Sequence, residues 1–533
     1  MTQRAFLDVE RSLTGRRWIG PSVESERLAE AMMQATRLPL ALCQTLVTRN
    51  VLPADAKSYL APSLRDLLPD PAKLLDMTKA AARFLTAVKN RQRIAIFADY
   101  DVDGGSSAAL LIVWLRAMDR TATLYIPDRI DEGYGPNVPA MATLGAAHDL
   151  IVCVDCGTLS HAPIAAAGCD VIVLDHHLGG DTLPPAHAVV NPNRQDEDGT
   201  LGHLCAAAVV FLMLVEANRQ LRQDAIKGPD LMPMLDLVAL ATVADVAPLI
   251  GVNRAFVRQG LVVMGRRDRK GLRALADVAR LDTAPTAYAL GFVLGPRVNA
   301  GGRIGQADLG ARLLATDDPF EATALAAKLD LLNTERRAIE ALVRIEALVQ
   351  AEARGTTGAL AWAAADGWHP GVVGIVASRL KEATHRPSVV IGFDGDDGKG
   401  SGRSIAGVDL GAAVHLLAAE GLIQKGGGHK MAAGLSLTRA QLEPAMARLE
   451  ALLARQGAAI GAVADMRVDA LLMPTAITTA LVEEVEAAGP FGASSPAPRF
   501  ALANQQVQAR RMGDNHLRVT FGDGGVKLEA VLF

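Results

Sequence analysis

Four short apolar runs constrain the fold of this chain more than any other feature of its sequence. They lie at residues 93–98, 124–126, 149–154 and 170–174. The segment from Gly105 to Met118 follows the first run and is apolar enough to be a helix. Short apolar runs separated by helices are typical of a mostly parallel sheet covered on both faces. The sequence therefore predicts an α/β fold, with further helices at about 205–221 and 233–247.

The second half of the chain repeats this pattern and then changes. Residues 318–354 contain no Gly or Pro after Pro319, which predicts one long helix joining two lobes; a core helix of the second lobe is the alternative. An alternating pattern from Ala359 to Phe393 predicts a second α/β lobe, followed by Gly-rich loops at 395–407 and 426–434. Short strands then predict a small β module, at Phe500–Gln508, Leu517–Phe521 and Val526–Phe533.

Length and composition agree with several folded domains. A chain of 533 residues suggests about three or four domains. The net charge of −4 excludes a protein that coats nucleic acid through its overall charge, and the 50% hydrophobic content excludes global disorder. Aromatic residues are only 4%, so few remain for stacking on bases.

The cysteines and the lengths of the apolar runs also indicate the cellular location of the protein. Cys153 and Cys156 lie at an apolar run, which favours buried packing cysteines over a redox pair. The N-terminus lacks the apolar core of a secretory signal, and Cys205–Val215 is too short to span a bilayer, which needs about 20 residues. We expect a soluble, cytoplasmic protein.

Three aspartates, Asp99, Asp101 and Asp103, directly follow the first apolar run. Ligands bind beyond the carboxyl ends of parallel strands, and clustered carboxylates are costly there unless a cation neutralises them. A calcium loop of the EF-hand type also begins with this spacing. That loop needs a liganding Glu at its twelfth position, where this chain has Leu110. A solvated turn is the other alternative.

The same placement recurs in three other segments. Asp155 follows the run 149–154, Asp175-His176-His177 follows the run 170–174, and Asp245 closes an apolar helical segment. Each one alone could be an ordinary turn residue, but four segments with Asp or His at one edge indicate a shared site. Carboxylates with imidazole suit two Mn²⁺ or Mg²⁺ ions, and the absence of cysteine from these motifs argues against structural zinc.

These motifs resemble those of the DHH phosphoesterase superfamily, in the same order along the chain. The segments are Asp99-Tyr-Asp-Val-Asp-Gly104, Val154-Asp-Cys-Gly157, Leu174-Asp-His-His177 and Val243-Ala-Asp-Val246. Gly426-Gly-Gly-His-Lys-Met-Ala-Ala-Gly434 is similar to the signature of the DHH-associated domain. Pro296–Ile304, Gly367–Gly371 and Ser401–Ser404 resemble one branch, the RecJ family of bacterial single-strand-specific 5′→3′ DNA exonucleases.

The resemblance implies roles for the motif residues. The implied metal ligands are Asp101, Asp103, Asp155, His176 and Asp245, with Asp155 shared by both ions. His177 would face the scissile phosphate, and Asp99 and Asp175 would support the site without holding metal. Because imidazole favours Mn²⁺ over Mg²⁺, we expect Mn²⁺ to support at least equal activity.

Phosphate binding is expected in the cleft between the lobes. The implied contacts are Arg297, Arg303, Ser401, Arg403, His429 and Lys430, with Arg379 as a weaker candidate. A basic run is either a solvated helix face or a groove wall that tracks the DNA backbone. The run comprises Arg258, Arg266, Arg267, Arg269, Lys270 and Arg273. Tyr134, Trp368 and Phe491 are stacking candidates, with packing as the alternative.

The expected architecture is a DHH-type parallel-sheet lobe and a DHH-associated α/β lobe, joined by a long helix and followed by an OB-like β module. The expected parts are a helical lead-in (1–75), the catalytic domain (76–270), a connecting region (271–355), the DHH-associated domain (356–458) and the β module (459–533). Pro490-Phe-Gly-Ala-Ser-Ser-Pro496 departs from the family's Pro-Phe-Gly-x-Gly-Asn-Pro, and family members continue beyond the position of Phe533. We therefore expect an incomplete barrel.

The resemblance implies a two-metal exonuclease that degrades single-stranded DNA from a 5′ end to 5′-mononucleotides in repair and recombination. A nanoRNase or small-nucleotide phosphodiesterase of the same superfamily is one alternative, and a non-catalytic replication scaffold is another. Single-strand-binding protein and a RecQ-type helicase are the partners that the family implies. We expect a monomer with no membrane association.

Overall fold

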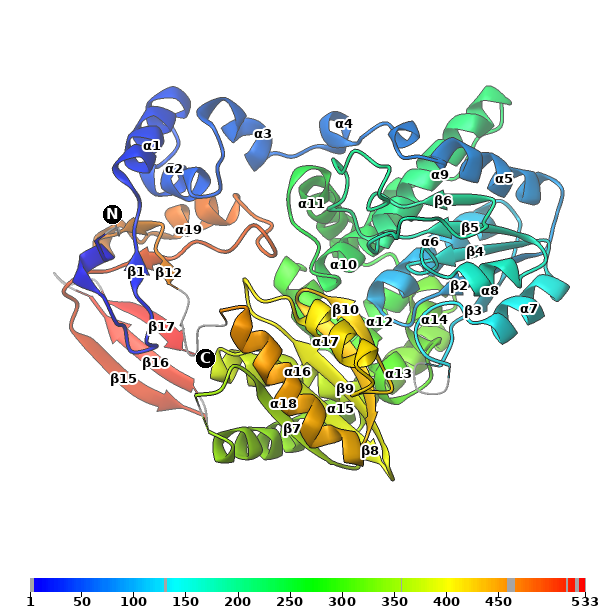
Figure 1. Ribbon diagram of the computed structural model, residues 1–533. Coiled ribbons are helices and arrows are strands. Elements are labelled where there is room, and N and C mark those ends of the chain that lie inside the picture. Colours follow the sequence, from blue (N-terminus) through cyan, green and yellow to red (C-terminus); the bar gives the residue numbers. More distant parts are fainter. Residues whose placement is uncertain are drawn as a thin grey trace.

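The structure is a computed structural model that describes residues 4–128, 132–355, 357–457, 465–513, 516–522 and 527–532. Figure 1 shows two α/β lobes, each around its own sheet, with a helical lead-in along the top and a β module at the left. This arrangement confirms the predicted fold class. In the described part of the chain, no helix is long and apolar enough to cross a membrane.

The first lobe contains a five-stranded parallel sheet in the order β3-β2-β4-β5-β6. Its strands are β2 (Ile94–Ala98), β3 (Ala122–Tyr125), β4 (Leu150–Val154), β5 (Asp170–Leu174) and β6 (Ala188–Val190). Every residue of β2 and β4 is buried, as a parallel sheet covered on both faces requires. The strand β6 is short and was not predicted from the sequence.

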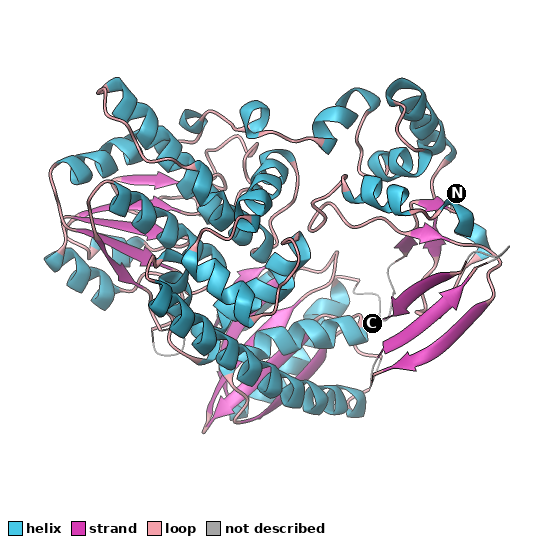
Figure 2. Cartoon of the chain, turned by 180° about the vertical axis from the view of Figure 1, so that it is seen from behind, coloured by secondary structure: helices cyan, strands magenta, loops and turns pink. Residues whose placement is uncertain are grey.

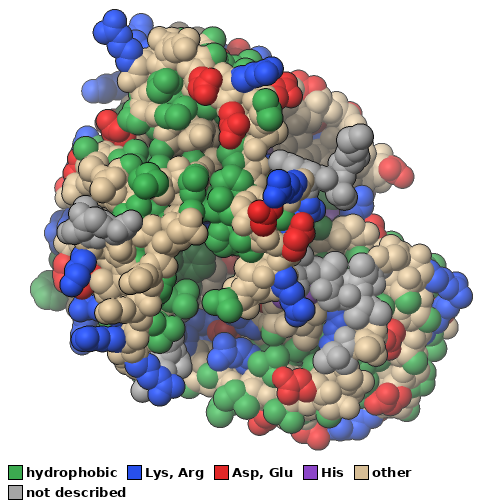
Figure 3. All heavy atoms as spheres, turned by 90° about the vertical axis from the view of Figure 1, so that its left-hand side faces the viewer, with side chains coloured by type: hydrophobic (Ala, Val, Ile, Leu, Met, Phe, Trp, Pro, Cys, Tyr) green, Lys and Arg blue, Asp and Glu red, His purple; other side chains and the backbone are tan. Residues whose placement is uncertain are grey.

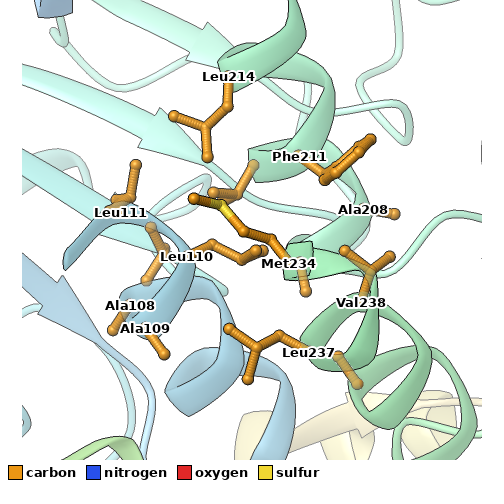
Figure 4. Close-up of a cluster of buried hydrophobic side chains, with 14 of the residues drawn as sticks. Ala108, Ala109, Leu110, Leu111, Ala208, Phe211, Leu214, Met234, Leu237 and Val238 are labelled. Atoms are coloured by element: carbon orange, nitrogen blue, oxygen red, sulfur yellow. The ribbon is translucent and has the colours of Figure 1, made fainter. Parts of the chain in front are cut away.

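Helices cover both faces of this sheet, and alternate strand residues divide between two cores. Ile96, Val152 and Ile172 face the larger core with helices α5, α6, α9 and α10, whereas Phe97 and Cys153 face α7 and α8. The bounds are α5 (Met77–Lys89), α6 (Val102–Ala117), α7 (Val138–Ala147), α8 (His161–Ala165), α9 (Ala206–Gln223) and α10 (Leu235–Ala244). Figure 4 shows the larger core where α6, α9 and α10 meet.

All five cysteines are free thiols, so the structure holds no disulfide. Cys153 lies in β4 and Cys156 two residues after it, and both side chains are fully buried. Burial raises the pKa of both thiols. The C-x-x-C spacing therefore reflects packing, as predicted.

A further group of helices follows α10. They are α11 (Gly251–Gly265), α12 (Lys270–Val278), the π-helix η5 (Ala289–Leu294), α13 (Gly295–Ile304), α14 (Leu309–Ala315) and α15 (Pro319–Ala353). The predicted long helix is confirmed by α15, where Asp318 accepts a hydrogen bond from Phe320 N at 2.8 Å. Leu325 and Leu329 of α15 pack in the first lobe, whereas Val343 and Ala347 pack in the second, so α15 joins the lobes.

The second lobe has a mixed five-stranded sheet in the order β10-β11-β9-β8-β7, in which only β7 and β8 run parallel. Its strands are β7 (Ala361–Asp366), β8 (Ser388–Asp394), β9 (Asp397–Arg403), β10 (Lys425–His429) and β11 (Ala432–Thr438). Its helices are α16 (Pro370–Thr384), α17 (Leu410–Ala419) and α18 (Arg439–Arg455).

The prediction that 395–407 and 426–434 are Gly-rich loops is wrong for most of those residues, because they form β9, β10 and part of β11. Glycine is common in loops, but here it admits close packing of side chains on the sheet. A Cβ on Gly400 would lie 2.8 Å from Ile391 Cγ1, and one on Gly428 would lie 2.4 Å from Ala432 O. Gly428 also has a φ of 150°.

The helical lead-in contacts the C-terminal part of the chain. Its elements are η1 (Phe6–Asp8), β1 (Trp18–Ile19), α1 (Val23–Thr36), α2 (Leu40–Val47), η2 (Pro53–Asp55), α3 (Ala56–Leu60), α4 (Leu64–Leu67) and η3 (Pro71–Lys73). The strand β1 pairs in parallel with β12 (Met466–Arg467). Met32 and Leu46 pack with Ala488 and Phe491. Figure 2 shows the N-terminal segment beside the C-terminal strands.

The β module contains a three-stranded antiparallel sheet of β15 (Val507–Met512), β16 (His516–Phe521) and β17 (Leu528–Leu532). Before it come β13 (Ala470–Leu471), η6 (Pro474–Ala476), α19 (Thr479–Glu486) and β14 (Phe500–Ala501), with β13 and β14 paired. The predicted single strand Phe500–Gln508 is wrong: Asn504, at a φ of 53°, lies between β14 and β15. Val526 and Phe533, the ends of the last predicted strand, lie outside the described residues.

Arg254 of α11 fixes the loop that precedes β14. Its side chain is 3% exposed and donates to Ala488 O at 2.8 Å, Gly489 O at 3.0 Å and Pro490 O at 3.2 Å. It also donates to Ser495 Oγ at 3.2 Å, and its guanidinium lies 3.8 Å from the centre of the Tyr59 ring. Ser495 is one of the residues where this loop departs from the family's pattern.

We expect Arg254→Met to lower the melting temperature by roughly 5 °C, because it leaves the buried carbonyls of Ala488 and Pro490 and the half-buried carbonyl of Gly489 without this donor. Limited proteolysis should cut the loop 488–497 faster in this variant. Arg266→Met is the matched control, because Arg266 lies at the exposed end of the same helix. Equal melting temperatures for the two variants would contradict this role of Arg254.

Candidate metal centre

The four predicted acidic segments meet at one edge of the first sheet. β2 ends at Ala98, next to Val154 of β4, which in turn lies next to Leu174 of β5. The aspartates that follow these strands therefore lie side by side, as the strand order requires. Asp245 joins them from the end of α10.

Asp101 and Asp103 are held by the first turns of two helices. Asp101 caps α6 and accepts hydrogen bonds from Asp103 N at 2.8 Å and Gly104 N at 3.1 Å. Asp103 accepts from Ala206 N at 2.7 Å and Ala207 N at 2.8 Å, at the start of α9. Backbone amides at helix N-termini are good donors to carboxylates, so these bonds fix the positions of both side chains.

Asp155 lies at the centre of the cluster. Its side chain is 2% exposed, and its backbone has a φ of 60°, which is uncommon for a residue other than glycine. Its Oδ1 accepts no hydrogen bond from any described residue, although His176 Nε2 lies 3.3 Å away. A buried carboxylate oxygen without a donor fits a bound cation.

His176 brings three of the carboxylates together. Its Nε2 lies 3.3 Å from Asp155 Oδ1, 3.7 Å from Asp103 Oδ2 and 3.8 Å from Asp245 Oδ2. Three groups have ligand atoms within 4.8 Å of one another: Asp103 with His176 and Asp245, Asp155 with His176 and His177, and Asp99 with Asp101 and Asp155. Asp155 and His176 each occur in two of these groups.

Asp175 orients the two histidines. Its Oδ1 accepts from His176 N and His177 Nδ1, both at 2.8 Å, and its Oδ2 accepts from Thr158 Oγ1 at 2.7 Å. Burial alone would raise the pKa of Asp175, but the hydrogen bonds from His177 and Thr158 lower it. Burial would lower the pKa of His177, but the bond to Asp175 raises it to about 9. His177 is therefore a cation that donates to Asp175 at neutral pH.

The other carboxylates are held at a high electrostatic cost. Burial, followed by repulsion from neighbouring aspartates, raises the pKa of Asp155 well above its usual range and that of Asp245 to about 8. Burial also raises the pKa of Asp103, against the attraction of His176. Carboxylates with raised pKa values that surround an imidazole form a donor set suited to divalent cations.

Sequence reasoning missed the residues that hold the histidine loop. Asn191 follows β6 at the same sheet edge and donates to His177 O and Thr158 Oγ1, both at 2.8 Å. Asn193 Nδ2 donates to His176 O at 2.5 Å. The only sequence signal was their place after the short strand β6. Tyr134, weighed above as a stacking residue, donates to Asp155 O at 3.1 Å and packs edge-on against His177.

The second lobe presents a cavity of about 360 Å³ lined by Lys399, Ser401, Arg403, Gly428 and the start of α16. Arg403 donates to Ser401 Oγ at 2.9 Å, so these two predicted residues lie together. Arg303 approaches from the first lobe and donates to Gly371 O at 3.1 Å. His429 and Lys430 are exposed at the end of β10.

Other predicted cations have protein partners. Arg297 pairs with Asp330 at 2.8 Å, and Arg379 pairs with Glu382 at 3.0 Å. In the basic run, Arg269 pairs with Asp236 at 2.7 Å, and Arg258 donates to Ala487 O at 3.3 Å. The run is therefore partly structural. Arg266, Arg267, Arg269 and Arg273 also line a cavity of about 540 Å³ on the first lobe.

Two α/β lobes joined by a long helix, with aspartates and a D-H-H histidine pair at one sheet edge, define a phosphoesterase of the DHH type. Three family models match the chain: the DHH family N-terminal domain at 93–242, the DHHA1 domain at 356–455 and the RecJ OB domain at 468–533. The chain belongs to the RecJ family.

Relatives of known function support this membership, and each match covers most of this chain and most of the relative. The single-stranded-DNA-specific exonuclease RecJ of Dickeya dadantii is 40% identical over 88% of this chain and 85% of its own, and that of Escherichia coli is 37% identical over 93% and 89%. A crystal structure of Thermus thermophilus RecJ in complex with Mn²⁺ is similar, with a TM-score of 0.81 at 32% identity, covering 96% of this chain and 73% of that one. The corresponding Mg²⁺ complex gives 0.73 at 30% identity, covering 96% and 72%.

We expect the thermal stabilisation of the protein by Mn²⁺ to grow from about pH 6 to about pH 8. Without metal, the raised carboxylate pKa values mean that the folded state binds more protons than the unfolded state, so stability falls as pH rises through this range. The cation removes that penalty and competes with protons that are fewer at high pH.

The measurement is the shift in melting temperature between Mn²⁺ and EDTA at each pH. Asp245→Asn should flatten the pH dependence, because it removes the group whose pKa lies at about 8. A shift that is constant or that falls with pH would contradict the assignment of these carboxylates to the cations.

Proposed function

We propose that this chain is a two-metal exonuclease that degrades single-stranded DNA in the 5′→3′ direction to 5′-mononucleotides, in repair and recombination. The observation that carries the proposal is the convergence of Asp103, Asp155 and Asp245 on His176, with Nε2-to-carboxylate distances of 3.3 to 3.8 Å. Membership of the RecJ family, whose relatives are named single-stranded-DNA-specific exonucleases, supports the substrate.

We assign the metal ligands to Asp101, Asp103, Asp155, His176 and Asp245, with Asp155 between the two ions. When bound, two Mn²⁺ or Mg²⁺ ions offset the charge of the phosphodiester and lower the pKa of water. Asp99 belongs to one of the three groups of close ligand atoms, so it is a further candidate beyond the predicted set.

His177 is assigned to the scissile phosphate. Its Nδ1 is held by Asp175 at 2.8 Å, and its side chain is 39% exposed, so the ring can reach a bound substrate. The raised pKa keeps it protonated at neutral pH. A protonated imidazole can donate a hydrogen bond to a phosphate oxygen and stabilise the negative charge that develops there.

The polarity of the reaction would be set by the second lobe. Ser401 and Arg403 line a cavity with backbone amides of Gly-rich strands, which is the chemistry that binds a terminal phosphate. Arg303 lies between this cavity and the first lobe. We propose that the cavity binds the 5′-phosphate, with His429 and Lys430 at its edge and Arg297 as a supporting contact.

A nanoRNase or small-nucleotide phosphodiesterase would use the same metal residues. The match of residues 468–533 to the RecJ OB domain does not favour that alternative, because a domain of this kind binds a longer strand. A non-catalytic scaffold is disfavoured by the complete set of candidate ligands. Single-strand-binding protein and a RecQ-type helicase stay predictions from the family, as do the monomeric state and the cytoplasm.

We expect Asp155→Asn to lower the rate of nucleotide release by about a thousandfold or more, because bound cations contribute several kcal/mol to the transition state. The assay follows 5′-labelled and 3′-labelled single strands with Mn²⁺. The wild type should release the 5′ label first. Release of the 3′ label first, or full activity of the variant, would refute the proposal.

We expect Arg403→Gln to reduce the preference for 5′-phosphorylated over 5′-hydroxyl strands by roughly tenfold, since a charge-assisted hydrogen bond contributes about 1.5–3 kcal/mol. The comparison is kcat/KM on the two substrates. Arg379→Gln is the matched control, because Arg379 is half-exposed on α16 and pairs with Glu382. If both variants keep the preference of the wild type, the cavity does not bind the terminal phosphate.

A further inference from the structure

The loop that carries Asp101 and Asp103 is held by a distant part of the chain. Val102 lies between these two candidate ligands, and its backbone N–H donates to Asn299 Oδ1 at 2.9 Å. Asn299 belongs to α13 and lies 197 positions later in the sequence. A side chain outside the four acidic segments therefore contacts the backbone between two of the candidate ligands.

This hydrogen bond completes the N-terminus of α6. The first amides of a helix have no acceptor within the helix itself. Asp101 Oδ1 accepts hydrogen bonds from two of them, Asp103 N and Gly104 N. Val102 N is the first amide of α6, and Asn299 supplies its acceptor. The loop is thus fixed both by its own carboxylate and by a side chain from α13.

The helix α13 also packs closely against the same loop. A Cβ on Gly302 would lie 2.6 Å from Tyr100 Cδ2 and 2.8 Å from Tyr100 Cβ, so glycine is needed for this approach. The helix is itself anchored, because Arg297 pairs with Asp330 of α15 at 2.8 Å. The acceptor of Val102 N therefore lies on a helix whose own position is fixed.

Asp101 and Asp103 belong to different groups of close ligand atoms. Asp101 is grouped with Asp99 and Asp155, and Asp103 is grouped with His176 and Asp245. Because Val102 lies between Asp101 and Asp103, a shift of its amide would move one ligand in each group. The contact with Asn299 consequently acts on both parts of the centre.

A neutral acceptor suits the electrostatics of this place. A carboxylate could also accept from Val102 N, but it would add to the repulsion among the buried aspartates. Charged side chains are found at the surface instead: Figure 3, viewed from the side of the β module, shows Lys and Arg in the hollow beside hydrophobic side chains. The amide oxygen of Asn299 fixes the loop without changing the net charge of the cluster.

We infer that Asn299 is a positioning residue of the metal centre, which fixes the spacing of Asp101 and Asp103 through the Val102 amide and so strengthens cation binding. The inference rests on the metal ligands assigned in the proposed function. Groups that orient metal ligands typically contribute about ten- to a hundredfold to metal affinity. Because Asn299 acts through the loop, its loss should weaken the binding of the metal and leave the affinity for the strand unchanged.

The first test measures Mn²⁺ binding without substrate, from the electron paramagnetic resonance signal of free Mn²⁺. Asn299→Leu keeps the size of the side chain and removes the acceptor, so we expect the dissociation constant of Mn²⁺ to rise about tenfold. Asn218→Leu is the matched control, because Asn218 accepts from Trp114 Nε1 at 3.1 Å at the other ends of α6 and α9. The control should lower the melting temperature in EDTA and leave Mn²⁺ binding unchanged.

A double-mutant cycle assigns the effect to the hydrogen bond. Val102→Pro removes the donor, and proline is tolerated at the first position of a helix when the preceding residue is extended, as Asp101 is. In the Val102→Pro background, Asn299→Leu should change the dissociation constant of Mn²⁺ by less than about twofold, because the bond is already lost.

The last test separates positioning from contact with the strand. For Asn299→Leu, raising the Mn²⁺ concentration should restore kcat on single-stranded DNA, with KM for the strand unchanged. Wild-type Mn²⁺ binding in Asn299→Leu, or an equal loss in both backgrounds of the cycle, would overturn the inference. So would a raised KM that Mn²⁺ does not restore, because Asn299 would then contact the substrate. A wild type that binds no Mn²⁺ would instead refute the ligand set of the proposed function, and the inference with it.

Discussion

The repulsion between buried carboxylates is the interaction on which the rest of this structure depends. Asp103 and Asp155 are 1% and 2% exposed and lie beside Asp245 around one imidazole. In the protein interior, where water is excluded, negatively charged carboxylates a few ångströms apart repel one another strongly. Burial and this repulsion raise the pKa values of the carboxyl groups. The protein counters this with backbone amides at the start of α9 and with His176. Those contacts are too few to neutralise the set, so divalent cations complete it.

The division of the site between two lobes follows from the length of α15. Its first half packs in the core of the first lobe and its second half in the core of the second lobe, so a continuous helix sets the spacing between the two lobes. The lobes also touch directly: a Cβ on Gly371 would lie 2.1 Å from Arg303 O, so only glycine fits there. The same approach places Arg303 beside the cavity of Ser401 and Arg403.

The convergence of the candidate ligands could be predicted from the sequence, because buried parallel strands appear as apolar runs and their carboxyl ends meet at one edge. Asp155 and Asp175 directly follow two such runs, so their positions at the sheet edge could be predicted. Supporting residues could not be predicted, because Asn191 and Thr158 act through hydrogen bonds and read as ordinary turn residues. The strands β9 and β10 were misread because glycine lacks the side chain that a strand pattern needs.

Ion pairs between residues far apart in the sequence could not be predicted either. The Arg and Lys side chains of the basic run show this most clearly. From the sequence, Arg269 belongs to a basic run that is either a solvated helix face or a groove wall. In the structure its guanidinium pairs with Asp236, which lies 33 positions away in the sequence. The near-neutral net charge was uninformative for a similar reason, since it averages an acidic centre against cations spread over both lobes. Tyr288 and Phe292 fall in a stretch with no motif, and only the fold reveals that the rings stack.

The contacts of the lead-in explain how the β module can act with a centre on another lobe. β1 pairs with β12, Arg49 pairs with Asp469 at 3.1 Å, and Arg254 holds the loop before β14. These contacts join the two ends of the chain to α11, which packs on α10, the helix that ends at Asp245. The loop before β14 is thereby connected to the helix that ends at the candidate ligand Asp245. Because Arg254 ties this loop to the helix that packs on α10, the β module is anchored to the lobe that carries the candidate ligands.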